Sequence, residues 1–365
     1  MLGALINLLF ITETPREDSD RISFSNASET LKIAYAGIPS MLARFSRPMK
    51  ALAVIIILGF IGMVLGAHKL VFGASGLARN LGISPLMIGL TIVAFGTSAP
   101  EIFSSAVAAL NNTPELAIGN ALGSNLFNIG VALAVAAIIS PLKPPESLVK
   151  KEIPALLLVT VITGVLLLDL YLGYFDALVL IAITAFFGYK LFRKRVRTAT
   201  VAVMEEPGPT TVNSLQALTY LILGLALLVL SAEALVAAAS SIAESLGVSA
   251  AIIGLTVVAL GTSLPELAAS VTCVLKGHHD LAIGNIVGSN ILNLLVVLPF
   301  PGLLAPGPVE FALVARDYSF VLILTMLLTF FCYRAVKKGT MIGRKYGAVF
   351  LSIYCVWFTV MILQV

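Results

Sequence analysis

Charged residues are scarce in this 365-residue sequence: Asp, Glu, Lys and Arg together make up 12% of it, against 59% hydrophobic residues. Soluble domains carry about 25% charged and about 45–50% apolar residues, so an ordinary soluble protein is excluded. Apolar runs of about 20 residues recur after position 50, and this is the length that a helix needs to cross the hydrocarbon core. The runs lack the alternation of membrane β-strands. The composition therefore predicts an all-α, polytopic membrane protein surrounded by a lipid bilayer.

Cysteine and histidine are scarce too, with three residues of each. The cysteines show no C-x-x-C spacing, so they predict neither a disulfide framework nor a zinc site, and we interpret them as small buried side chains. The net charge of +4 comes from Lys and Arg in short stretches between the apolar runs. It does not indicate a nucleic-acid partner, and no cofactor is predicted.

The apolar runs predict ten membrane spans in two halves, preceded by an N-terminal tail at residues 1–50. The tail lacks a basic n-region and an Ala-x-Ala-like cleavage site, so we do not interpret it as a signal peptide; a surface amphipathic segment, a disordered tail and an over-long start assignment stay open. Residues 51–192 hold five spans, residues 193–213 form a polar linker, and residues 214–365 hold five more. The spans are predicted near 51–73, 83–110, 115–139, 153–170, 174–192, 214–243, 249–275, 280–304, 317–334 and 345–364.

The two halves are related by an internal duplication. A shift of 165 residues lays residues 89–128 onto residues 254–293, with 21 identities in 40 positions. Each half holds an odd number of predicted spans, so the second half enters the membrane from the opposite side, which gives an inverted repeat. The connections after odd-numbered spans carry 15 Lys or Arg, and those after even-numbered spans carry one, Arg316. By the positive-inside rule the 193–213 linker is cytoplasmic and both termini lie outside, although the six basic residues of the tail do not favour its translocation.

A helix-breaking octet occurs twice inside the apolar runs, as AFGTSAPE from Ala94 and as ALGTSLPE from Ala259. Pro100 and Pro265 lack an amide hydrogen, so each is predicted to break or kink its helix near the bilayer midplane. A glycine four residues before each proline is expected to loosen the same turn. Backbone carbonyls freed in this way are costly in lipid unless another group satisfies them, and they are suitable ligands for a hard cation.

Each octet also ends in a glutamate, Glu101 or Glu266. An ionised glutamate near the bilayer centre costs at least about 2.5 kcal/mol, so such a residue indicates function by default. Two neighbouring carboxylates repel each other unless a cation lies between them. We therefore predict that the two glutamates meet around one cation.

A second duplicated string follows each octet: GNALGSNLFN at residues 119–128 and GNIVGSNILN at residues 284–293. Alone, such a string could serve as interhelical packing. Directly after an acidic octet, it predicts the neutral half of the same site. Its oxygen-bearing side chains lie four residues apart on one helix face, and they are Ser124, Asn128, Ser289 and Asn293. Because all the candidate ligands are oxygens, the site is predicted to bind Ca²⁺ or Na⁺ rather than Zn²⁺, Cu⁺ or Fe.

These paired motifs resemble the signature repeats of the cation/Ca²⁺ exchanger superfamily, in particular the Na⁺/Ca²⁺ exchangers of the prokaryotic type. The resemblance covers residues 51–365 and implies an antiporter, not an enzyme, that exchanges Na⁺ for Ca²⁺ across the plasma membrane by alternating access. It also implies that the first and sixth spans slide against the other eight. Its implied ion ligands are the carboxylates of Glu101 and Glu266, the backbone carbonyls of Thr97, Thr262, Ala94 and Ala259, and the side chains of Ser98, Ser263, Ser124, Ser289, Asn128 and Asn293.

The sequence departs from some relatives in being neutral at both Asn128 and Asn293, where an aspartate can occur. With two carboxylates the Na⁺ stoichiometry stays open. Gly123 and Gly288 stand where the proton-coupled branch has an acidic residue, which favours Na⁺ over H⁺ as the coupling ion. Antiport coupled to H⁺ or K⁺, and a Ca²⁺-permeable channel, remain the alternatives.

Overall fold

The computed structural model describes residues 47–198, 212–247 and 259–364, and almost all of them are helical. Residues 58–365 form one compact unit, and of the other unit, residues 1–57, only the start of one helix is described. Residues 1–46 of the predicted tail and residues 199–211 of the predicted linker therefore lie outside the described part of the chain.

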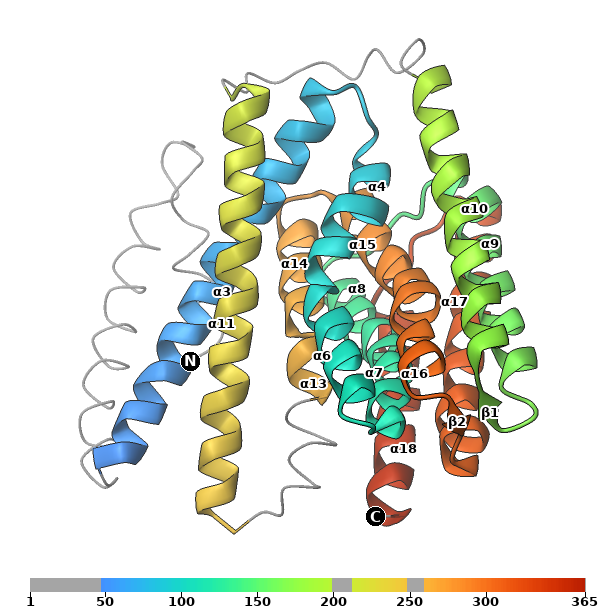
Figure 1. The fold of residues 1–365 in the computed structure, drawn as a ribbon. Helices are drawn as coiled ribbons and strands as arrows, with labels where there is room; N and C mark the ends of the chain where they lie inside the picture. The colour runs from blue at the N-terminus through green and yellow to red at the C-terminus, as the bar shows by residue number, and fades with distance from the viewer. Residues whose placement is uncertain (1–46, 199–211, 248–258, 365) are drawn as a thin grey trace. The chain divides into compact units, whose positions relative to one another are not determined.

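The first half contains ten helical segments and one short strand among the described residues (Figure 1). They are α3 (Arg47–Asn80), α4 (Pro85–Ile88), the π-helix η1 (Gly89–Val93), α5 (Ala94–Thr97), α6 (Ala99–Leu110), α7 (Pro114–Phe127), the π-helix η2 (Asn128–Leu133), α8 (Ala134–Ile139), α9 (Glu146–Leu166), β1 (Tyr171–Leu172) and α10 (Tyr174–Thr198).

The described part of the second half has a similar order. Its elements are α11 (Ser214–Ser245), α13 (Ala259–Thr262), α14 (Leu264–Leu275), α15 (His279–Leu292), the π-helix η4 (Asn293–Val297), α16 (Pro299–Leu304), β2 (Gly307–Pro308), the π-helix η5 (Leu313–Tyr318), α17 (Ser319–Lys338) and α18 (Arg344–Gln364). In this half the short strand precedes the helix α17 instead of following it, and a further π-helix leads into α17.

Six of the described helical stretches are long and apolar enough to cross a membrane. A seventh span results if Pro85–Thr97 and Ala99–Leu110, which are bent by 43° at their junction, count as one broken helix. Tyr174–Tyr189 and Leu260–Leu275 are shorter apolar helices. The chain is thus a helical, multi-pass membrane protein.

Helix ends differ from the predicted span ends. Helix α3 continues to Asn80 instead of ending near residue 73, and α10 continues to Thr198, six residues into the predicted linker that begins at residue 193. The added segment of α10 is rich in Lys and Arg, which are good helix formers. Hydropathy marks where the apolar stretch of a helix ends. The helical backbone can continue beyond that point into a polar segment.

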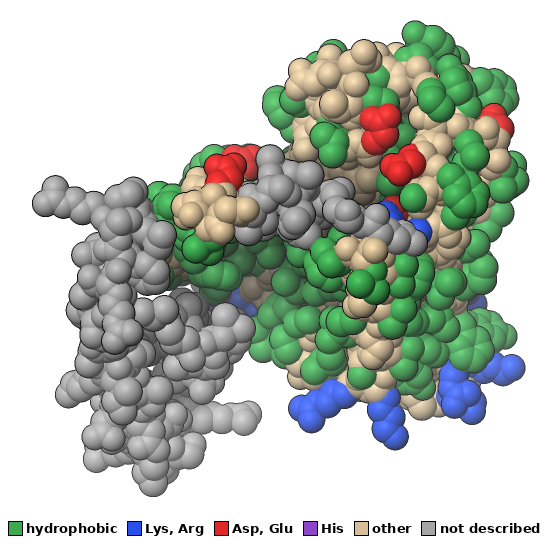
Figure 2. Space-filling view, turned by 90° about the horizontal axis from the view of Figure 1, so that it is seen from below, with side chains coloured by type: hydrophobic (Ala, Val, Ile, Leu, Met, Phe, Trp, Pro, Cys, Tyr) green, Lys and Arg blue, Asp and Glu red, His purple; other side chains and the backbone are tan. Residues whose placement is uncertain are grey.

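Large hydrophobic side chains are exposed over much of the surface, as Figure 2 shows for one face of the molecule, where Lys and Arg side chains gather along one edge. Phe103 is 76% exposed, Leu168 73% and Phe311 69%. A soluble monomer rarely exposes apolar area on this scale, because it would associate through it. Such a surface is suited to contact with the acyl chains of a lipid bilayer.

Helices α3 and α11 lie side by side and in direct backbone contact (Figure 1). A Cβ at Gly66 of α3 would lie 2.6 Å from the backbone nitrogen of Leu228, and one at Gly224 of α11 would collide with the backbone nitrogen of Leu70. Small residues allow this approach between membrane helices. The two helices therefore form a tightly packed pair.

Connections in one half pair with connections in the other. Strands β1 and β2 are antiparallel, with Leu172 opposite Gly307, and an isolated antiparallel bridge joins Leu142 to Ile342. Leu142 and Gly307 differ by 165, which is the offset of the duplication. Each of these two positions thus pairs with a residue of the opposite half.

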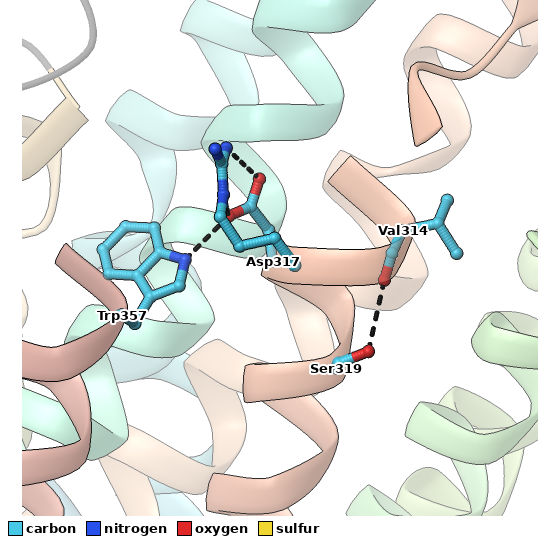
Figure 3. Close-up of polar contacts among 5 residues, drawn as sticks. Val314, Asp317, Ser319 and Trp357 are labelled. Atoms are coloured by element: carbon cyan, nitrogen blue, oxygen red, sulfur yellow. Dashed lines mark hydrogen bonds and ion pairs between the residues drawn. The ribbon is translucent and has the colours of Figure 1, made fainter. Parts of the chain in front are cut away.

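A buried polar contact joins η5 to α18 (Figure 3). Asp317, which is 5% exposed, accepts hydrogen bonds at Oδ1 from Nε of Arg316 (2.8 Å) and from Nε1 of Trp357 (2.7 Å). The hydroxyl of Tyr318 donates a 2.7 Å hydrogen bond to the Thr160 carbonyl of α9. Charged and indole groups are costly to bury without partners, so these contacts favour one arrangement of the three helices.

Candidate functional site

Both octets break their helix at a serine. Ser98 lies between α5 and α6 with φ −82° and ψ 6°, and Ser263 lies between α13 and α14 with φ −91° and ψ 5°. These angles belong to the bridge region rather than to the α-helix. Pro100 and Pro265 follow two residues later, within the first turn of the next helix, where a missing amide hydrogen is tolerated.

The two glutamates are each held by the opposite octet. Ser98 Oγ donates a 3.0 Å hydrogen bond to Oε1 of Glu266, and Ser263 Oγ donates one of the same length to Oε1 of Glu101. All four side chains are completely buried. The segments 165 residues apart therefore meet at a single place and exchange equivalent contacts.

The duplicated GN strings supply further oxygens to this place. The Ser124 and Ser263 hydroxyls are 3.0 Å apart and hydrogen-bonded, and Ser124 also lies next to the Glu101 carboxylate. Ser289 lies next to the Glu266 carboxylate but makes no hydrogen bond within the described residues. A π-helix begins at Asn128 and another at Asn293. π-Helical turns inside α-helices are frequent at functional sites.

Several buried oxygens in this region have no hydrogen-bond partner among the described residues. Buried polar groups are nearly always paired, so each exception needs an explanation. A cation that accepts lone pairs from all of them would provide one. Among the predicted ligands, the unpartnered oxygens are Oε2 of Glu101, Oε2 of Glu266, Oγ of Ser289, Oδ1 of Asn128 and Oδ1 of Asn293, and Oδ1 of Asn290, which was not predicted as a ligand, also lacks a partner.

The remaining predicted ligands lie on the short helices before each break. Ala94 and Thr97 are completely buried at the two ends of α5, and Thr262 is half-buried at the end of α13. The Ala94 carbonyl accepts hydrogen bonds from Ser98 N (3.0 Å) and from Thr97 Oγ1 (3.4 Å). Ala259 begins α13, and its side chain lies outside the described residues.

The two octet glycines have a further role that sequence reasoning missed. A Cβ at Gly96 would lie 2.6 Å from Cδ2 of Leu225, and one at Gly261 would collide with Val236. Leu225 and Val236 both belong to α11. These glycines thus allow α11 to lie close against both broken helices, in addition to any loosening of the turn.

Two asparagines that sequence reasoning did not assign also join the network. Asn120 accepts a 3.4 Å hydrogen bond from Thr262 Oγ1, and Asn285 accepts one of 3.2 Å from Thr97 Oγ1. The available signal was their duplication: each lies four residues before Ser124 or Ser289, on the same helix face.

The site is chemically an oxygen cluster with two carboxylates. The side chains that meet here offer carboxylate, hydroxyl and amide oxygens, and the broken helices add backbone carbonyls. Hard cations such as Ca²⁺ prefer these ligands. Two carboxylates also match the charge of one divalent cation.

The same family model, described as "Sodium/calcium exchanger protein", matches the chain twice, over residues 51–192 and over residues 216–363. The chain belongs to this family. Its membership in the prokaryotic part of the cation/calcium exchanger superfamily, predicted from the paired motifs, is confirmed.

Relatives from bacteria and archaea match this exchanger over most of their length. It is 35% identical over 309 residues to the inner membrane protein YrbG of Escherichia coli, with 83% of this chain and 94% of the relative covered. It is 30% identical over 349 residues to the sodium/calcium exchanger MaX1 of Methanosarcina acetivorans, with 84% and 97% covered.

Solved structures of the sodium-calcium exchanger NCX_Mj have the same fold. The structure soaked with 10 mM Na⁺ and no Ca²⁺ superposes with a TM-score of 0.74 at 32% identity, covering 85% of this chain and 99% of that one. Family and fold together identify the chain as a membrane transporter of the cation/Ca²⁺ antiporter type.

Proposed function

We propose that this exchanger couples the movement of Na⁺ down its gradient to Ca²⁺ movement in the opposite direction, and that both ions bind at the Glu101–Glu266 site. The observation that carries the proposal is the reciprocal pair of Ser–Glu hydrogen bonds, with one carboxylate oxygen of each glutamate left without a partner among the described residues. The two carboxylates to which these Oε2 atoms belong together balance the charge of one Ca²⁺. Competition of Na⁺ for the same oxygens is the simplest physical basis for antiport.

The ligand roles in this proposal are those that the family resemblance implies. Glu101 and Glu266 bind Ca²⁺ together with the backbone carbonyls of Thr97 and Thr262. The Na⁺ sites flank this centre and use the Ser98 and Ser263 hydroxyls and the Ala94 and Ala259 carbonyls. Asn128, Asn293, Ser124 and Ser289 complete the oxygen shell from α7–η2 and α15–η4.

Alternating access in this proposal is a movement of α3 and α11 against the remaining helices. Their backbones touch at Gly66 and Gly224, so they move as one body. Helix α11 also contacts Gly96 and Gly261 of the octets, which brings the moving pair directly against the ion site. A shift of α11 along these glycines would change which side of the membrane reaches the glutamates.

The membrane arrangement proposed here has ten spans, as two inverted sets of five, in the plasma membrane, which is the inner membrane in a bacterium. The 193–213 linker is cytoplasmic and both termini lie outside. The distribution of Lys and Arg supports this orientation, and the match of one family model to each half supports the repeat. Accessibility of single cysteines placed at residues 143 and 310 would test it: the first is expected to react only from the cytoplasmic side, the second only from outside.

The experiment that tests the function is isotope flux in proteoliposomes. Vesicles loaded with Na⁺ and diluted into choline medium with radioactive Ca²⁺ are expected to accumulate Ca²⁺, with the pH gradient collapsed by an ionophore. Replacing internal Na⁺ by K⁺ or choline is expected to abolish uptake. The matched variant Glu266→Gln should show no Na⁺-dependent uptake.

Each alternative gives a different result in the same assay. Uptake that needs a pH gradient would show that H⁺ is the coupling ion, and uptake that needs internal K⁺ would show that K⁺ is. Ca²⁺ flux that is independent of any counter-ion would indicate a channel. Either result would overturn the Na⁺/Ca²⁺ proposal and leave the ion site in place.

A further inference from the structure

We propose that Asn120 and Asn285 are positioning residues that hold the broken helix of the opposite repeat, and thereby fix the Thr97 and Thr262 carbonyls toward the ion. This inference rests on the proposed ion site and adds to it two residues that are not ion ligands. Its physical basis is a pair of equivalent hydrogen-bond clamps, one in each repeat.

The first clamp joins three segments through one amide. Asn120 of α7 donates from Nδ2 to the backbone carbonyl of Glu101 (3.2 Å) and to Ser105 Oγ (3.0 Å), both in α6. Its Oδ1 accepts from Thr262 Oγ1 (3.4 Å) at the end of α13. The Asn120 side chain thus ties its own repeat's glutamate segment to the residue before the break in the other repeat.

The second clamp repeats this pattern at the offset of 165. Asn285 of α15 donates from Nδ2 to Ser270 Oγ of α14 (3.3 Å), and its Oδ1 accepts from Thr97 Oγ1 (3.2 Å) at the end of α5. Asn285, Ser270 and Thr97 are completely buried. The contacts among Asn, Ser and Thr are thus the same in both copies, and Asn120 has in addition its hydrogen bond to the Glu101 carbonyl.

These contacts matter because the threonines end their helices at the break. Pro100 cannot donate to the Gly96 carbonyl, and Ser98 has left the helical conformation. A segment with a disrupted hydrogen-bond ladder needs other contacts to fix its carbonyls. The asparagine amide supplies one through the threonine hydroxyl.

The amide chemistry separates these asparagines from the proposed ligands. Asn120 and Asn285 use both their donor and their acceptor on protein groups. Asn128, in contrast, has no partner for either amide atom among the described residues, so its oxygen is available to an ion. The clamp uses an acceptor oxygen and an N–H donor on separate atoms of one amide, and Asn is the shortest side chain that carries an amide.

The test is a double-mutant cycle in which calorimetry measures Ca²⁺ binding to the purified protein in detergent. Asn285→Ala and Thr97→Val each break the clamp; the valine keeps the Thr97 carbonyl and removes only the hydroxyl. Each single variant is expected to bind Ca²⁺ at least about fivefold more weakly, since both lose the buried hydrogen bond between Thr97 and Asn285, and Asn285→Ala also loses the one to Ser270. The double variant should be no weaker than the weaker of the two single variants.

Asn111→Ala, an exposed asparagine at the end of α6, serves as the matched control and is expected to leave Ca²⁺ affinity unchanged. Melting temperatures of all variants separate positioning from folding, because a purely structural role lowers stability without changing the affinity of the folded protein. Additive losses in the cycle, or unchanged affinity in Asn285→Ala, would overturn the inference.

The binding assay also keeps this inference distinct from the transport proposal. If the unchanged protein binds Ca²⁺ and the cycle is non-additive, the clamp stands whatever ion proves to drive transport. If the unchanged protein exchanges Na⁺ for Ca²⁺ and the variants bind Ca²⁺ normally, transport stands and the clamp fails. An unchanged protein that binds no Ca²⁺ removes the clamp together with the ion site.

Discussion

Ser98 of the first repeat donates its hydroxyl hydrogen to Glu266 of the second, at 3.0 Å, and Ser263 returns the same contact to Glu101. Neither repeat alone therefore completes the proposed ion site. Each carboxylate takes its hydrogen bond from the segment that carries the other carboxylate. A cation bound between them would pull on both broken helices at once, which links ion occupancy to the relative position of the two repeats.

The first prediction concerns the carboxylates themselves. Glu101→Gln or Glu266→Gln keeps the side-chain size and removes one negative charge, so Ca²⁺ would face a single carboxylate in a low-dielectric setting. We expect Na⁺-dependent Ca²⁺ uptake to fall to background in both variants. Asn128→Ala removes one neutral oxygen and is expected only to raise the Ca²⁺ concentration for half-maximal uptake. Near-normal uptake by either Gln variant would contradict the site.

The second prediction concerns the reciprocal serines. Ser98→Ala and Ser263→Ala each remove one hydrogen bond to a buried carboxylate, and such bonds contribute about 1.5–3 kcal/mol. We expect both variants to lose Ca²⁺ affinity by about tenfold or more, and by similar amounts, because their contacts are equivalent. Ser104→Ala, at a half-buried position on α6, is the control. A large effect in one serine variant and none in the other would show that the two Ser–Glu hydrogen bonds, although similar in geometry, do not contribute equally to Ca²⁺ affinity.

The sequence allowed much of this arrangement to be predicted because its strongest signals are local. A proline and a glycine within one octet predict a broken helix from backbone chemistry alone, and a duplicated motif predicts that two copies meet. Which hydroxyl would bond which carboxylate depends on tertiary packing, so the crossing of Ser98 to Glu266 could not be derived.

Other features escaped prediction for the same reason. Gly96 has a tertiary role because Leu225 of α11 approaches it, and no local pattern near residue 96 encodes that neighbour. The π-helices at Asn128 and Asn293 are changes in hydrogen-bond register that leave the hydropathy pattern intact. Asn120 and Asn285 were visible as repeats, but their clamps need the positions of Thr262 and Thr97.

The third prediction concerns the α3–α11 pair. An added Cβ at Gly224 would collide with the backbone of Leu70, which cannot rotate away as a side chain can. Gly224→Ala is therefore expected to force the two helices apart and to reduce Ca²⁺ uptake strongly, while Ca²⁺ affinity in detergent changes little. Gly188→Ala on α10, where nothing lies within 4 Å of the added atom, is the matched control. Equal uptake by the two variants would show that close packing of α3 and α11 is not needed for transport.

The fourth prediction concerns the buried contact between η5 and α18 in Figure 3. Trp357→Phe keeps an aromatic ring and removes the 2.7 Å hydrogen bond to Asp317, which still has Arg316 as a partner. We expect a loss of about 1 kcal/mol in the free energy of unfolding. Asp317→Ala should cost more, because it leaves both the buried indole N–H and the guanidinium without this partner.

Thermal unfolding in detergent measures both effects, with Tyr333→Phe, an exposed position on α17, as the control. Neither Asp317 nor Trp357 belongs to the proposed ion site, so the Ca²⁺ affinity of the folded variants is expected to equal that of the unchanged protein. A drop in affinity without a drop in melting temperature would mean that this contact acts on the ion site rather than on the packing of α18. The order of the two melting temperatures, with Asp317→Ala below Trp357→Phe, is the outcome that the burial of the carboxylate requires.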